Sequence, residues 1–283
     1  MRVWNKYFVT NDLNLVNDYF PCAKDVEYFD KSTSFVIEKV ALKKEILDDN
    51  KYYKKEIRKG IERKILKTDK VLSLGSGNGE HEIPLILNGY NIEISDFNEP
   101  LLTTVKEIFP EANFHVINLL HPDFEKKYAA LAGKYDVILV PGLIYAFNNF
   151  EAKKIFNNIK VFLKNEGRLV LNVRSKNSML TWLVDNILTK IECKLRVKFL
   201  KIGMGYFTQM HGYRRTIKEV IQLVQSLENY SATDVLYLDS RTELSRSYIL
   251  SIIPGLSPLI RVLFKKYCAY SNFIEFRYQR KNA

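Results

Sequence analysis

Cysteine and histidine are scarce in this sequence, and neither residue type is clustered. The 283 residues include three cysteines, Cys22, Cys193 and Cys268, which lie far apart, and four scattered histidines. This spacing provides no set of metal ligands and no framework for disulfide bonds. We therefore expect no metal site, and we expect the protein to work in the reducing cytoplasm.

Long hydrophobic runs are also missing. Residues 1–18 lack the apolar core of a secretory signal. The longest uncharged stretch near the C-terminus, residues 247–260, is too short to span a bilayer and is interrupted by proline. Three interpretations of the apolar segment 247–264 stay open. It could contact the inner face of a membrane, pack against a partner in a homodimer, or pack against the protein's own core.

Positive charge is in excess. The chain has 43 Lys and Arg against 32 Asp and Glu, which gives a net charge of +11. A basic balance favours an anionic partner such as nucleic acid, an anionic membrane surface or a phosphorylated substrate. Over residues 39–70, however, lysines alternate with acidic residues, and no long run of Lys or Arg appears. We interpret most of these lysines as solvated helix faces, which makes nucleic acid the less favoured partner.

From residue 70 onward, short apolar segments alternate with segments of helical periodicity. This alternation predicts βαβ units and therefore a parallel sheet in an α/β fold. We divide the chain into a helical addition that caps the substrate side, residues 1–69, and an α/β domain, residues 70–283, with insertions at 174–213 and 240–270. The expected strands cover residues 71–74, 90–96, 113–120, 135–140, 167–173, 232–239 and 272–281, and the expected helices cover 80–89, 100–109, 151–163 and 216–227.

The stretch "VLSLGSGNGE", residues 71–80, places three closely spaced glycines directly after the first of these strands. Glycines at a strand-to-helix turn allow positive φ and let a ligand approach the main chain. Asp96 ends the next strand about 20 residues on, where it can bind the hydroxyls of a ribose. No Gly-Lys-Ser/Thr sequence follows, so the loop is not a P-loop. Glu80 at the helix start disfavours the pyrophosphate of a dinucleotide and suits a ligand that carries a cation there.

The ordered series "VLSLGSGNGE", "IEISDFNEPLL", "VINLLHPDF", "YDVILVPGLIYAF" and "FLKNEGRLVLNV" resembles the successive motifs of class I S-adenosylmethionine-dependent methyltransferases. The resemblance covers roughly residues 52–173. It implies a Rossmann-like domain with a seven-stranded, mostly parallel sheet in the order 3-2-1-4-5-7-6, helices on both faces and an antiparallel last strand. It also implies S-adenosyl-L-methionine as the cofactor.

The resemblance assigns roles to individual residues. The turn under the methionine part of the cofactor would be formed by Gly75, Ser76, Gly77 and Gly79. Asp96 would hold the ribose hydroxyls, and Phe97 would pack against the adenine. Asn118 and Leu119 fall at the adenine amino group, although the family often has an acidic residue where Asn118 stands. The residues between cofactor and acceptor would be Pro141, Gly142 and Tyr145.

The acceptor is the methyl-receiving molecule, and the sequence limits its chemistry. Families that methylate the amines of bases often carry Asn/Asp-Pro-Pro-aromatic after the fourth strand, whereas this chain has "VPGL" at 140–143. The stretch "GYFTQMHGYRR" at 205–215 offers His211 as a catalytic base, because its ordinary pKa lies near neutrality, and Tyr145 as a second catalytic residue. A surface histidine in an irregular loop is the competing interpretation of His211.

These observations favour O-methylation of a small molecule, with a sugar or glycan intermediate preferred. An RNA methyltransferase is the first alternative, because the chain is basic. A cofactor-binding scaffold without catalytic activity is the second.

Overall fold

The structure is a computed structural model of the chain, and it describes residues 2–5, 8–10, 39–48, 52–176, 213, 215–238 and 271–279. The predicted apolar segment 247–264, the base candidate His211 and nearly all of both predicted insertions lie outside the described residues. Within the described part, no helix is long and apolar enough to cross a membrane.

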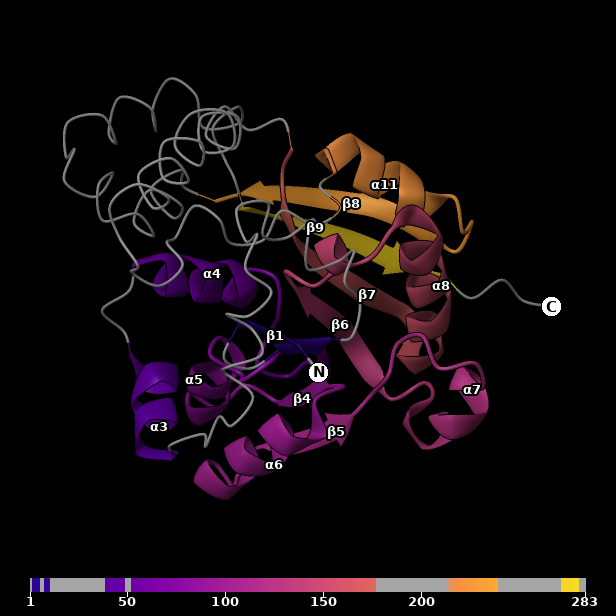
Figure 1. The fold of residues 1–283 in the computed structure, drawn as a ribbon. Coiled ribbons are helices and arrows are strands. Elements are labelled where there is room, and N and C mark those ends of the chain that lie inside the picture. The colour runs from indigo at the N-terminus through magenta and orange to yellow at the C-terminus, as the bar shows by residue number, and fades with distance from the viewer. Residues whose placement is uncertain are drawn as a thin grey trace, which may run out of the picture.

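The centre of the molecule is a seven-stranded sheet with the order β5-β4-β3-β6-β7-β9-β8 (Figure 1). Numbered along the domain, this is the predicted order 3-2-1-4-5-7-6, and β9 is antiparallel to both of its neighbours as predicted. The class I methyltransferase fold expected from the sequence is therefore confirmed. The strands are β3 Val71–Leu74, β4 Ile92–Asp96, β5 Asn113–Val116, β6 Tyr135–Pro141, β7 Leu163–Arg174, β8 Tyr230–Tyr237 and β9 Ser271–Tyr278.

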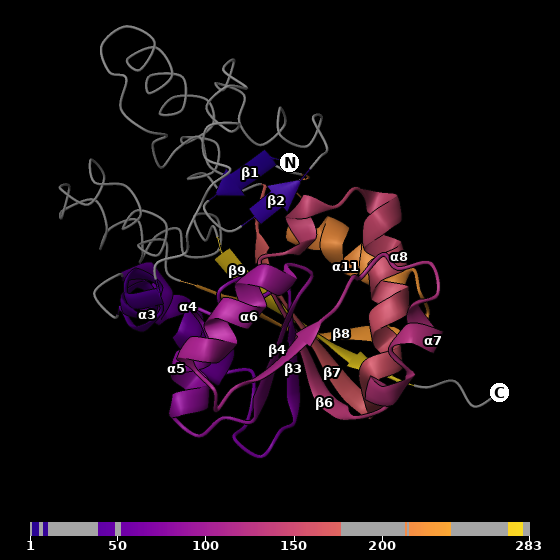
Figure 2. The same ribbon diagram turned by 60° about the horizontal axis from the view of Figure 1, so that its bottom comes forward.

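Helices cover both faces of this sheet, as the view in Figure 2 shows. One face carries α3 Lys39–Leu47, α4 Tyr52–Glu62, α5 Glu82–Leu87 and α6 Glu99–Ile108. The other face carries α7 Phe124–Lys127, α8 Asn149–Ile159 and α11 Ile217–Gln225. Short 3-10 turns, η1 Ala129–Leu131, η2 Ile144–Ala146 and η3 Lys160–Phe162, complete the connections.

Local sequence explains where the helices begin. The Thr216 side chain accepts a hydrogen bond from the Glu219 backbone, and the Glu219 side chain accepts one from the Thr216 backbone. This is the capping box that the T-x-x-E sequence predicts, and it satisfies two backbone N–H groups at the start of α11. Asn148 and Glu151 form the same arrangement at the start of α8.

The faces of the central strands explain why the helices pack where they do. Leu72 and Leu74 of β3 face the core under α7, α8 and α11, whereas Val71 faces the core under α4 and α5. Alternation along a strand sends successive side chains to opposite faces, so both faces of the sheet are apolar and both need a helical cover. Ile57, Ile61 and Ile65 provide that cover from α4 and the residues after it.

The N-terminal region differs in part from the helical addition expected over residues 1–69. Helices α3 and α4 are present, but Arg2–Asn5 and Phe8–Thr10 form two short antiparallel strands, β1 and β2. These segments contain Val3, Trp4, Phe8 and Val9, which are residue types that favour strands over helices. The charged residues that follow carry the helical periodicity.

Candidate cofactor and acceptor site

The glycine turn joins β3 to α5 at the carboxyl edge of the sheet. Gly75, Gly77 and Gly79 adopt φ values of +68°, +58° and +70°, a region that side chains rarely tolerate. A Cβ on Gly75 would lie 2.5 Å from Cδ2 of Leu143, so the loop after β6 packs directly on the turn. A Cβ on Gly77 would meet no atom within 4 Å, so open space lies beside that residue.

Asp96 is bonded to the same turn. The pairing of Leu74 with Ser95 brings the ends of β3 and β4 together. One carboxylate oxygen of Asp96 accepts from the Gly77 N–H at 2.9 Å, and the other accepts from the Asn98 N–H at 3.0 Å. Burial raises the pKa of Asp96, although these backbone N–H groups act in the opposite direction. A carboxylate kept in a site that disfavours its charge is typical of functional positions.

The residues of the turn fit a nucleoside cofactor. The Ser76 Oγ is buried, and no hydrogen-bond partner for it appears in the described part of the chain. Open space at Gly77 lies next to the Asp96 carboxylate, whose oxygens can accept further hydrogen bonds. A buried hydroxyl, a bare backbone and a carboxylate at one sheet edge are the groups that a ribose and a methionine chain would need.

The residues predicted to hold the adenine lie in the next two loops. Phe97 follows Asp96 and is 48% exposed. Asn118 is exposed after β5, and its side-chain oxygen accepts from the Leu120 N–H at 3.0 Å. The Leu119 side chain packs into the core, and its carbonyl accepts from the Asn158 side chain at 2.8 Å. The adenine contacts of these three residues stay predictions.

On the acceptor side, Pro141 and Gly142 follow β6 as expected. Pro141 is the register partner of Asn172 on β7. A Cβ on Gly142 would lie 3.7 Å from the Tyr145 ring and 3.8 Å from the Asn172 side-chain oxygen, so this glycine sits between an aromatic ring and an amide. Asn172 is buried and lies 2.9 Å from the Ser271 hydroxyl. The sequence interpretation identified Tyr145 but not Asn172, because the β7–β9 pairing is a long-range contact.

The chain that returns from the first insertion is fixed beside Tyr145. The Tyr213 N–H donates to the Tyr145 carbonyl at 2.7 Å. Arg215 is buried, and its guanidinium donates to the carbonyls of Ile144, at 3.1 Å, and Phe147, at 2.7 Å. The 205–215 stretch was predicted to border the acceptor side, and the described residues 213 and 215 do lie against the turn that carries Tyr145. The catalytic role of His211 remains a prediction.

Glu82 is a functional candidate that the sequence reasoning missed. It is fully buried at the start of α5 and accepts a hydrogen bond from the Ser73 hydroxyl at 2.7 Å. Its second oxygen has no hydrogen-bond partner in the described part of the chain. Burial raises the pKa of Glu82 to about 7. A charged residue at the first position of the otherwise apolar helix "EIPLIL" was the available signal.

We expect Glu82→Gln to remove a pH dependence of stability. The carboxyl pKa is about 7 in the folded chain against 4.5 as its ordinary value, so the folded state holds the proton more tightly. The resulting stabilisation is complete below pH 4.5 and is lost as the pH rises through about 7. Between pH 5 and pH 9, wild type should therefore lose about 3 kcal/mol of unfolding free energy through this carboxyl group. The Gln variant should not show this loss.

Urea denaturation followed by circular dichroism at the two pH values measures this effect. Glu62→Gln, which changes an exposed carboxylate on α4, is the matched control and should show the same loss as wild type. Parallel pH profiles for wild type and Glu82→Gln would contradict the assignment.

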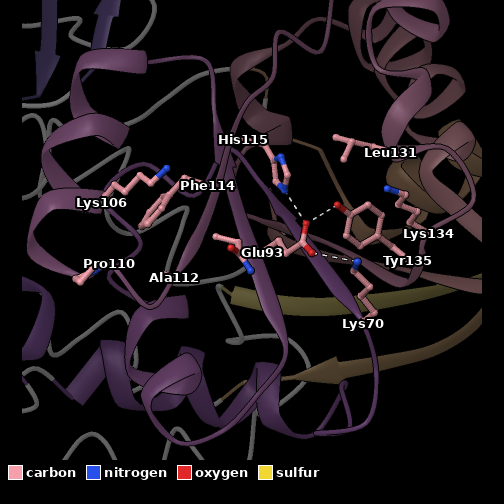
Figure 3. Close-up of a pocket in the computed structure, with 11 residues that line it drawn as sticks. Lys70, Glu93, Lys106, Pro110, Ala112, Phe114, His115, Leu131, Lys134 and Tyr135 are labelled. Carbon is pink, nitrogen blue, oxygen red and sulfur yellow. Dashed lines mark hydrogen bonds and ion pairs between the residues drawn. The ribbon is translucent and has the colours of Figure 1, made fainter.

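A second polar cluster lies at the opposite, amino-terminal edge of the sheet. It lines a cavity of about 350 Å³ (Figure 3). Glu93 accepts from the Tyr135 hydroxyl at 2.6 Å, lies 2.6 Å from the His115 Nε2 and pairs with the Lys70 ammonium at 3.2 Å. Burial alone would raise the pKa of Glu93, but these partners together lower it. Since the polar groups satisfy one another, the cluster ties three strands together and is separate from the Asp96 site.

Metal ligands do not gather at either edge in the described residues. No group of three or more histidine, cysteine, aspartate or glutamate side chains there could hold a metal ion.

The comparisons with known proteins agree with the fold. The family model described as "Tellurite resistance protein TehB" matches residues 41–180, a range that includes the glycine turn, Asp96 and Tyr145. No curated protein matches the sequence.

Several solved structures share the fold at low sequence identity. The N-methyltransferase NodS from Bradyrhizobium japonicum, solved with S-adenosyl-L-homocysteine, is 11% identical with a TM-score of 0.50, covering 86% of this chain and 98% of its own. An S-adenosylmethionine-dependent methyltransferase from Methanosarcina mazei is 14% identical with a TM-score of 0.51, and the match covers 78% of this chain and 97% of that protein. A possible histamine N-methyltransferase from Thermotoga maritima is 11% identical with a TM-score of 0.50, and the match covers 80% of this chain and 89% of that protein.

The strand order and the glycine turn bonded to Asp96 define the fold class. The chain has the class I methyltransferase fold, and its residues 41–180 match the TehB family model. S-adenosyl-L-methionine as the cofactor stays a prediction that the groups at the Asp96 site fit.

Proposed function

We propose that this enzyme methylates a hydroxyl group of a small polar molecule, with a sugar or glycan intermediate as the preferred acceptor. The observation that carries the proposal is the arrangement of Tyr145, Gly142 and Asn172 at the carboxyl ends of β6 and β7. The phenol and the amide are neutral hydrogen-bonding groups, and Gly142 leaves the space between them narrow but free of a side chain. Such a surface suits a neutral hydroxyl-bearing molecule better than a phosphate.

This acceptor side directly adjoins the cofactor turn. Leu143 contacts Gly75, so residues 141–145 lie between the turn and the strand that carries Asn172. S-adenosylmethionine, when bound, supplies an electrophilic methyl group on a sulfonium. The protein's contribution would be to orient the acceptor hydroxyl through Tyr145 and Asn172 and to exclude water, which are effects of proximity.

Methylation of a hydroxyl also releases a proton. As the new carbon–oxygen bond forms and the carbon–sulfur bond breaks, the hydroxyl proton must leave to a base or to solvent. His211 is our candidate for that base, because it lies two residues before Tyr213, whose N–H is bonded to the Tyr145 carbonyl.

Two other acceptor classes have specific support. The net charge of +11 favours an RNA acceptor as the alternative. The structures from B. japonicum and T. maritima are described as N-methyltransferases, which favours a small amine. A scaffold that binds cofactor without catalysis is the non-enzymatic alternative.

Transfer of labelled methyl from S-adenosylmethionine into fractionated cell extract tests the proposal. Label in a soluble or lipid-linked glycan, identified by mass spectrometry as an O-methyl ether, is the expected result, and Asp96→Ala should reduce it. Label in RNA, with affinity that falls steeply as salt is raised, would replace the proposal by the RNA alternative. Label on nitrogen would indicate an amine acceptor, and cofactor binding with no transfer would indicate a scaffold.

The same proposal includes peripheral contact with a membrane and a homodimer. It also includes a location in the cytoplasm, at the inner face of the membrane. Their support is the apolar sequence of residues 247–264, which has Arg261 within it and Lys265 and Lys266 directly after it. Co-sedimentation with anionic liposomes at physiological salt tests the membrane contact. Recovery of the protein in the supernatant would favour a soluble acceptor.

A further inference from the structure

Lys54 is a fully buried lysine that joins three separate segments of the chain. It lies on α4, and its side chain has no exposed surface. Its ammonium donates to the carbonyl of Glu45 on α3 at 2.7 Å. The same ammonium pairs at 2.7 Å with the carboxylate of Glu80, the residue that ends the glycine turn. A single side chain therefore connects both N-terminal helices to the cofactor turn.

This connection is more specific than helix packing requires. Ile57 and Ile61 lie on the same face of α4, one and two turns further on, and they already pack that helix on the sheet. A buried ammonium loses its hydration, and it is tolerated only where an opposite charge and hydrogen-bond acceptors replace the water. An apolar side chain at position 54 would serve packing equally well, so the charge points to a role at Glu80.

Glu80 ends the glycine turn that we predict to contact the cofactor. The β4 side of the turn is fixed by Ser95, whose carbonyl accepts from the Ser76 N–H at 3.0 Å, and by Asp96. The α4 side is fixed by Lys54, which also offsets the Glu80 charge. The sequence suggested that Glu80 selects a cationic ligand by its own charge. The structure instead places that charge in an internal ion pair, so Glu80 does not act as an isolated anion toward the ligand.

We propose that Lys54 is a positioning residue of the cofactor site, and that α3 and α4 form part of the cofactor-binding unit. Lys54 acts through Glu80 by fixing the end of the glycine turn and neutralising its carboxylate. Without Lys54, the Glu80 side chain would lose the partner that holds it to α4, and the end of the glycine turn would be less firmly fixed. A looser turn would weaken binding.

Calorimetric titration of the full chain with S-adenosylhomocysteine tests this proposal. We expect Lys54→Met to weaken binding by about tenfold or more. Lys59→Met is the matched control, because Lys59 lies on the same helix but is exposed and pairs with Glu56, one turn away on that helix. This control should bind within about twofold of wild type.

The double variant Lys54→Met with Glu80→Gln separates positioning from stability. Replacing both charges of a buried pair by neutral groups often leaves stability unchanged, so this variant should fold even if Lys54→Met alone does not. We expect its thermal unfolding to be close to wild type, while its binding of S-adenosylhomocysteine stays about tenfold weaker because the link to the turn is lost. Wild-type affinity in the folded double variant would overturn the proposal.

Discussion

Asp96→Ala is expected to weaken the binding of S-adenosylhomocysteine by about 10- to 100-fold, equivalent to about 1.5–3 kcal/mol. The physical reason is twofold. The substitution removes the carboxylate that we predict holds the ribose hydroxyls. It also removes the acceptor at 2.9 Å from the Gly77 N–H, so the glycine turn loses one of its bonds to β4. Isothermal titration calorimetry on the unlabelled full chain measures the effect directly.

Two further variants make the result specific. Asp96→Asn keeps an oxygen that can accept from one backbone N–H but removes the charge, and it should give an intermediate loss. Glu111→Ala removes an exposed carboxylate before β5, at the amino edge of the sheet, and should leave affinity unchanged. If Asp96→Ala binds within about twofold of wild type, the ribose assignment is wrong.

Arg215→Met is expected to reduce the unfolding free energy by about 3–5 kcal/mol. The guanidinium donates to the carbonyls of Ile144, Phe147 and Tyr213 and to the Asn149 side chain at 2.8 Å. Methionine would remove this donor from all four acceptors, and an acceptor left buried and unsatisfied costs about 1–3 kcal/mol. Because the carbonyls belong to the turn that carries Tyr145, methyl transfer should fall as well.

Urea denaturation followed by circular dichroism measures the loss. Arg215→Lys should fall between wild type and Arg215→Met, because an ammonium cannot reproduce the planar fork of the guanidinium. Lys218→Met, an exposed change in the first turn of α11, should cost less than about 0.5 kcal/mol. A denaturation midpoint for Arg215→Met equal to that of the Lys218 control would exclude an anchoring role.

Binding of S-adenosylhomocysteine distinguishes the two effects. Arg215 contacts the acceptor side, whereas Asp96 contacts the glycine turn. Folded Arg215→Met should therefore retain most of its cofactor affinity, and folded Asp96→Ala should not.

Much of the fold follows from short-range patterns. Alternation of apolar strands and amphipathic helices from residue 70 predicts the parallel sheet, and the T-x-x-E sequence predicts the start of α11. The sheet order came from the resemblance to a family, because strand order depends on contacts between distant segments. The N-terminal strands β1 and β2 were missed, since charged helices dominate the pattern of residues 1–69.

The sequence by itself determined the glycine turn and its predicted neighbour in space, Asp96, because backbone conformation and the end of a parallel strand are local properties. Only the tertiary structure decided what surrounds them. The Lys54–Glu80 pair and the Arg215 anchor at the Tyr145 turn join residues that are far apart along the chain, and the Ser73–Glu82 bond joins a strand to the helix that follows it. In a sequence these residues look like ordinary surface charges, since burial and partner are set by packing between elements and not by local spacing.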